Sequence, residues 1–185
     1  LPPNLGVIAE ACGTETGRFP CVDGVKLVIS DSGGSYMVQA TDGRIAVTVE
    51  GPIIPGAEDY PGLAVFSKAP DTEKQAIVSG SFWKRMFASA RKIVKDAVVH
   101  MKSVAVKIGE EKIAMAAAND DAAKIEKSLL LTGKFPPVDG AFPDKTNLEF
   151  SINPERLIKL LKLAMEFCGP DGAGNPVVKI KIKGR

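Results

Sequence analysis

The chain has 185 residues, of which 45% are hydrophobic, so it can bury a sizeable core and is not a disordered segment. With 24 Lys and Arg against 22 Asp and Glu, its formal charge is only +2, which excludes a global basic signal for nucleic acid. A basic function would therefore depend on where the positive side chains are placed.

Cysteine usage and hydropathy indicate the compartment. Cys12, Cys21 and Cys168 show no metal-ligand spacing, and an odd number of cysteines argues against a disulfide framework. A reducing, cytoplasmic setting fits this usage best. No apolar run approaches the roughly 18 residues of a membrane span, and no signal peptide is recognisable. Because the chain starts at Leu1, we expect a trimmed chain or a fragment.

The first elements in the sequence are short. Residues 5–12 predict a helix, with Asn4 as its N-cap and Gly13 just after its end. A turn-rich stretch then leads to a predicted strand at 24–29. The Ser-Gly-Gly turn at 32–34 returns the chain beside this strand, which predicts an antiparallel meander.

Residues 36–50, YMVQATDGRIAVTVE, are the stretch around which the chain is organised. Alternation of apolar and polar residues, followed by a β-branched run, predicts two strands. Asp42-Gly43 separates them, because Asp can hydrogen-bond its local backbone and Gly accepts a positive φ. An ordinary hairpin explains this pattern on its own.

A proline-rich connection at 51–70 and a short strand at 75–78 precede an amphipathic helix at about 82–95, capped by Ser79 or Ser81. One arc of this helix is apolar, and the other carries no acidic residue. Solvated helix faces normally mix charges, so this arc suggests an anion-facing surface. Its positive residues are Lys84, Arg85, Arg91, Lys92 and Lys95.

The second half of the chain predicts strands at 98–101, 104–108, 112–118, 148–152 and 177–182. Residues 124–131 could be strand or helix, and the apolar cluster before a Gly favours a strand. Residues 133–144 hold three prolines and are non-helical. Asn153-Pro154 begins a helix that ends near Phe167. Antiparallel strands with few helices predict an α+β fold.

Three fragments, in this order and spacing, carry a family resemblance. They are RFPCVDGVKL at 18–27, ATDGRIAV at 40–47 and VDGAFPD at 138–144. Together they resemble the middle domain of the bacterial sliding clamp, the beta subunit of DNA polymerase III. The hairpin lacks one residue between Gly43 and Arg44, where the family often has His, and Lys145 replaces an expected aromatic residue.

The resemblance covers about one and a half clamp domains. It implies a clamp-like domain at 1–145, with antiparallel sheets backing a pair of helices. Residues 146–185 would be the helix-plus-strand part of an adjoining or completing unit. A family subunit has three such domains, and two subunits close a ring, so this chain is a fragment or a relative that assembles from more copies.

The resemblance also implies a function that needs no catalytic residue, cofactor or metal. A ring of clamp domains encircles duplex DNA without sequence preference, holds the polymerase on its template, and binds peptides of polymerase and clamp loader. The expected DNA-facing residues are Lys84, Arg85, Arg91, Lys92, Lys95, Arg156, Lys159 and Lys162. The expected peptide pocket is lined by Thr41, Gly43, Arg44 and Ile45.

Two other functions stay open at this stage. An enzyme is disfavoured because the single histidine, His100, lies in an apolar run and Cys12 and Cys21 have no evident base. Asp42 and Asp139 lie in turns, where local backbone bonding explains them. The second alternative is a clamp-fold scaffold for protein partners that does not load on DNA, which the small net charge favours.

Overall fold

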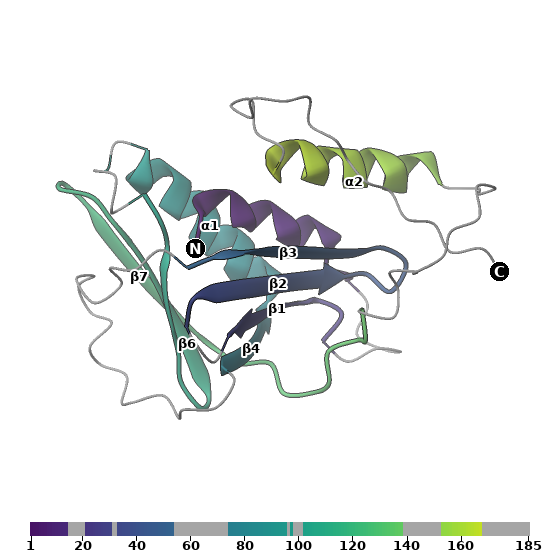
Figure 1. Ribbon diagram of the computed structural model, residues 1–185, viewed down its shortest axis with the longest axis horizontal. Helices are drawn as coiled ribbons and strands as arrows, with labels where there is room; N and C mark the ends of the chain where they lie inside the picture. The colour runs from purple at the N-terminus through teal and green to yellow at the C-terminus, as the bar shows by residue number, and fades with distance from the viewer. Residues whose placement is uncertain are drawn as a thin grey trace.

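The computed structural model describes residues 1–14, 21–30, 33–53, 74–95, 97, 102–138 and 153–167. Within these residues, a layer of helices lies against two antiparallel sheets (Figure 1). This arrangement confirms the predicted α+β fold, with antiparallel sheets and a few helices. None of the described helices is long and apolar enough to cross a membrane.

The first sheet has the strand order β3-β2-β1-β4. Its strands are β1 (Gly24–Ile29), β2 (Ser35–Thr41), β3 (Ala46–Pro52) and β4 (Lys74–Ser79). The first three form the predicted meander, and β4 returns antiparallel to β1.

The turn between β2 and β3 forms as the Asp-Gly pair predicts. Asp42 Oδ1 accepts hydrogen bonds from the backbone N–H groups of Arg44 at 2.9 Å and Ile45 at 2.8 Å. Gly43 has φ of 80°, a conformation that costs little only for glycine. This local bonding fixes the register in which Thr41 lies opposite Ala46.

The second sheet has the order β5-β6-β7, formed by β5 (Ala105–Ile108), β6 (Lys112–Ala118) and β7 (Ala123–Leu129). The choice of a strand over a helix near residue 124 is confirmed. Asn119 Oδ1 accepts from the N–H groups of Asp121 and Ala122 and closes the β6–β7 turn. After β7, Leu131 N–H donates to Ile77 O of β4 at 2.7 Å, so this segment connects the two sheets.

The helix layer contains η1 (Pro3–Ala11), α1 (Gly80–Val94) and α2 (Pro154–Phe167). They lie side by side with η1 in the middle (Figure 1). The side chain of Ser79 accepts from Phe82 N–H and caps α1, while that of Asn153 accepts from Glu155 N–H and caps α2. Both caps are as predicted.

The start of the first helix was wrongly predicted. The helix is of the 3₁₀ type, begins at Pro3 and has Pro2, not Asn4, in the N-cap position. Proline suits a first helical turn because it has no N–H to satisfy and its φ is already helical. Asn4 instead donates from Nδ2 to Glu166 O of α2 at 3.3 Å, so it joins two helices.

The core lies between the helix layer and the sheets. Trp83 and Phe87 of α1 are fully buried against Leu5 and Ile8 of η1. The Trp83 indole Nε1 donates to Leu5 O at 2.8 Å, and its ring lies 4.7 Å from the Phe87 ring, centroid to centroid. The apolar arc of α1 therefore packs inward, which leaves its basic arc on the solvent side.

Several predictions fall outside the described residues. These are the strands at 98–101, 148–152 and 177–182, the connection at 54–70, and the exit segment at 139–144. The proposed domain boundary at residue 145 also lies there, so the two-part division stays a prediction.

Candidate functional site

Positive charge is concentrated in the helix layer. The three helices and Lys95, the residue that follows α1, hold eight of the 24 Lys and Arg of the chain but only three of its 22 Asp and Glu. The rest of the chain is therefore slightly acidic. The weak net charge of the whole sequence hides this asymmetry.

All five predicted DNA-facing residues of α1 are exposed on the face of the helix turned away from the core. The three on α2 differ: Lys162 is exposed, whereas Arg156 and Lys159 are half-buried. Seven of the eight residues thus lie on α1 and α2, on either side of η1 in one layer, and Lys95 directly follows α1.

Three of the α1 residues are ion-paired with carboxylates from other elements. Lys84 pairs with Glu10 of η1, Arg85 with Glu126 of β7 and Arg91 with Glu166 of α2. The expectation of an arc without acidic residues holds along α1 itself, but not in three dimensions. The sequence reasoning missed these partners because each lies on a different element.

Arg91 is hydrogen-bonded to both of the other helices. Besides Glu166, its guanidinium donates to Pro3 O at 3.2 Å and Asn4 O at 3.3 Å. Arg91 therefore connects all three helices of the layer. In contrast, Lys92 and Lys95 form no ion pair with any carboxylate in the part of the chain that the structure describes.

The four predicted pocket residues lie together. Thr41, Gly43, Arg44 and Ile45 line an open groove of about 240 Å³. Thr41 Oγ1 donates to Ile45 O at 2.6 Å and accepts from Gly43 N–H at 3.0 Å, so the hairpin wall of the groove is internally bonded. The missing residue between Gly43 and Arg44 does not prevent this arrangement.

The opposite wall was not predicted. Pro136, Pro137 and Val138 complete the groove, together with Ala46 at the start of β3. Val138 is buried against Phe135, Ile77 and Cys21 in a small cluster beneath this wall. The available signal was the proline pair followed by an apolar residue, which is typical of a stiff apolar loop.

Neither of the two described cysteines has the surroundings of a nucleophile. Burial raises the pKa of the Cys12 thiol to about 12, and its Sγ donates to Gly24 O at 3.4 Å. Burial also raises the pKa of Cys21. Since the thiolate is the reactive form, both thiols are unsuited to nucleophilic chemistry near neutral pH. His100 lies outside the described residues.

Comparison with solved structures identifies the fold of this chain. No protein-family model and no curated protein matches the chain. Its structure is similar to the beta subunit of the DNA polymerase of Streptococcus pyogenes, with a TM-score of 0.52 and 16% identity over 79% of this chain. It is equally similar to the DNA polymerase III beta chain of Streptococcus pneumoniae, with a TM-score of 0.52 and 16% identity over 80% of this chain.

The chain has a clamp-like fold. It spans 33% of the length of either beta subunit. The clamp-like fold that the three sequence fragments implied is thus confirmed. At this level of identity the likeness concerns the fold alone, so binding properties need their own support from the residues of this chain.

Proposed function

We propose that the clamp-like domain is part of a sliding-clamp-type processivity factor that encloses duplex DNA and binds partner peptides. The observation that carries this proposal is the gathering of positive side chains on the exposed helix layer of an otherwise slightly acidic chain. Phosphate attraction is independent of base sequence, so such a layer suits a protein that slides.

The length of the chain constrains how a ring could form. Because it spans a third of a beta subunit, a closed ring needs further clamp-like units, from the same protein or from more copies. In either arrangement the helix layer would face the duplex and the sheets would face outward. No catalytic group is required, since retention would depend on topology.

Reversing the charges of Lys92 and Lys95, which have no ion pair among the described residues, is expected to weaken retention on DNA. The double substitution Lys92→Glu with Lys95→Glu removes two candidate phosphate contacts, so the slope of log K against log salt should fall by about 2. The protein retained on closed circular and on linearised plasmid is measured over a series of salt concentrations, by native gel or pull-down. A ring stays on circles and slides off linear ends, whereas an ordinary basic surface treats both alike.

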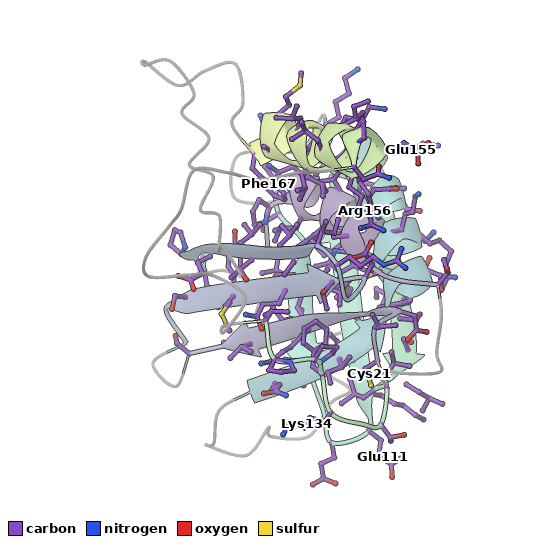
Figure 2. All side chains as sticks on the ribbon, turned by 90° about the vertical axis from the view of Figure 1, so that its right-hand side faces the viewer. Cys21, Glu111, Lys134, Glu155, Arg156 and Phe167 are labelled. Carbon is purple, nitrogen blue, oxygen red and sulfur yellow. The ribbon has the colours of Figure 1, made fainter. Side chains whose placement is uncertain are left out.

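The matched control for this experiment is Lys112→Glu with Lys134→Glu. Both residues are exposed, and Figure 2 shows Lys134 at the opposite end of the molecule from Glu155 and Arg156 of α2. This variant carries the same net charge as the test variant and should bind DNA like the parent chain. Equal losses in the two double variants would refute the assignment of the helix layer.

A second test concerns the groove. We infer that it holds a short peptide with apolar side chains, because Pro136, Pro137, Val138 and Ile45 provide apolar walls and Arg44 adds one exposed cation. Linear peptides can be selected from a displayed library for binding to the parent chain. They should bind the Arg44→Ala variant at least about tenfold more weakly, since a hydrogen bond to a charged group contributes about 1.5–3 kcal/mol. Calorimetric titration measures the peptide affinity of each variant, with Lys134→Ala as the control. If the peptides bind Arg44→Ala as tightly as the parent chain, they bind outside the groove.

One observation favours the alternative of a scaffold that does not load on DNA. Three of the five α1 cations are paired with carboxylates, which reduces the charge available for phosphate. Under this alternative, peptides would bind the groove while the circular plasmid would not be retained at any salt concentration. The two plasmid forms therefore separate the candidate functions.

A further inference from the structure

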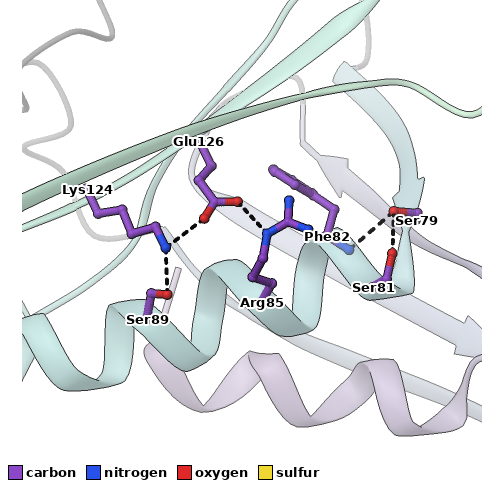
Figure 3. A network of polar contacts seen from close by, with 7 residues as sticks. All are labelled: Ser79, Ser81, Phe82, Arg85, Ser89, Lys124 and Glu126. Carbon is purple, nitrogen blue, oxygen red and sulfur yellow. Dashed lines mark hydrogen bonds and ion pairs between the residues drawn. The ribbon is translucent and has the colours of Figure 1, made fainter.

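Glu126 lies at the centre of a polar network between β7 and α1 (Figure 3). Its Oε2 accepts from Arg85 Nε at 3.0 Å, and its Oε1 accepts from Lys124 Nζ at 2.8 Å. Lys124 Nζ also donates to Ser89 Oγ of α1 at 2.8 Å. One carboxylate thus holds two cations beside the exposed face of the helix.

The burial of this carboxylate distinguishes it from the other two. The Glu126 side chain is only 16% exposed, whereas Glu10 and Glu166 are 46% and 38% exposed in their pairs. Ion pairs between exposed side chains contribute little because water and salt screen them. Glu126 is screened less, so its charge acts more strongly on its two partners.

Glu126 also keeps its charge near neutral pH. Burial alone would raise its pKa, but the hydrogen bonds from Lys124 and Arg85 outweigh this effect and lower the pKa below its ordinary value. The carboxylate is therefore ionised at neutral pH.

Arg85 remains accessible despite this partner. Its side chain is 60% exposed, and its guanidinium lies 5.8 Å from the centre of the Phe82 ring. The hydrogen bond to Glu126 uses its Nε, so the N–H groups of the two outer guanidinium nitrogens are not used in that pair. Arg85 can thus touch a phosphate while much of its charge is offset.

We propose that Glu126 is a positioning residue that fixes Arg85 and Lys124 beside the helix layer and weakens their attraction for phosphate. This inference rests on the proposed function, because it concerns the strength of a sliding contact with duplex DNA. A moving clamp needs many weak phosphate contacts and no strong ones, since each strong contact must break at every step. A half-buried carboxylate shared by two cations supplies this weakening without removing them.

The test is the salt dependence of duplex binding by the parent chain and by Glu126→Gln, measured by fluorescence anisotropy with a duplex of mixed sequence. Gln has nearly the same shape but no charge. We expect tighter binding and a slope of log K against log salt that is steeper by about 0.9 for each cation released. The control Glu111→Gln also removes one negative charge, but Glu111 is exposed and far from α2 in Figure 2, so it should leave the slope unchanged.

A comparison of two exposed cations on α1 keeps the inference testable if Glu126→Gln does not fold. Lys92→Gln, with no described carboxylate partner, should lower the slope by about 0.9, and Arg85→Gln by less than half as much. Equal effects of Arg85→Gln and Lys92→Gln, or equal slopes for Glu126→Gln and Glu111→Gln, would overturn the role of Glu126. A parent chain that does not bind the duplex even at low salt would instead overturn the proposed function, and this inference with it.

Discussion

Replacing Trp83 by Ala is expected to produce the largest loss of stability of any single substitution considered for this chain. The indole is fully buried, lies against the Phe87 ring and donates to Leu5 O. Truncating a buried aromatic side chain costs roughly 3–5 kcal/mol, through lost burial and the cavity left behind. Since domains of this size are stable by only about 5–15 kcal/mol, the variant should be at the edge of folding.

The conservative control is Trp83→Phe. Phenylalanine retains much of the ring contact but lacks the N–H group, so a smaller loss on the order of 1–2 kcal/mol is expected. Trp83 is the only Trp in the chain, so urea titrations must be followed by circular dichroism instead of indole fluorescence. If both variants unfold at the same denaturant concentration as the parent, the packing of α1 on η1 cannot be as described.

Local patterns in the sequence were sufficient to predict most of the described fold. The Asp42-Gly43 turn depends on one side chain, that of Asp42, and on backbone groups within three residues of it, so its geometry could be predicted from neighbouring positions. The same holds for the Ser79 and Asn153 caps. The start of η1 was missed because Asn4 was treated as a local cap, while its amide donates to a residue 162 positions away.

The candidate site could be predicted only in part, for the same reason. The basic arc of α1 follows from helical periodicity, and the hairpin wall of the groove follows from a family resemblance. The carboxylates Glu10, Glu126 and Glu166 come from three separate elements. Their positions depend on which helices and strands are neighbours in space, and no single stretch of sequence contains that information.

The second large effect on stability is expected for Gly6→Ala, because η1 and α1 approach closely at this residue. A Cβ added at Gly6 would overlap the Cβ of Phe87, and would lie 3.3 Å from its Cγ and 3.7 Å from its Cα. The overlapping Cβ is bonded directly to the helix backbone, so a rotamer change of Phe87 cannot move it out of the way. Gly6→Ala should therefore push η1 away from α1 and destabilise the chain by about 1–3 kcal/mol.

The sign of this effect is what makes it informative. At an uncrowded helix position, Gly→Ala stabilises a protein by about 0.4–1 kcal/mol, because the unfolded chain loses freedom. A thermal or urea denaturation experiment on Gly6→Ala thus has two clearly different outcomes. A loss of stability supports direct contact between the two helices, whereas a gain would show that η1 stands away from α1. If η1 stood away from α1, Lys84 and Glu10 could not form their ion pair. The arrangement of the helix layer that carries the proposed DNA contacts would then be wrong.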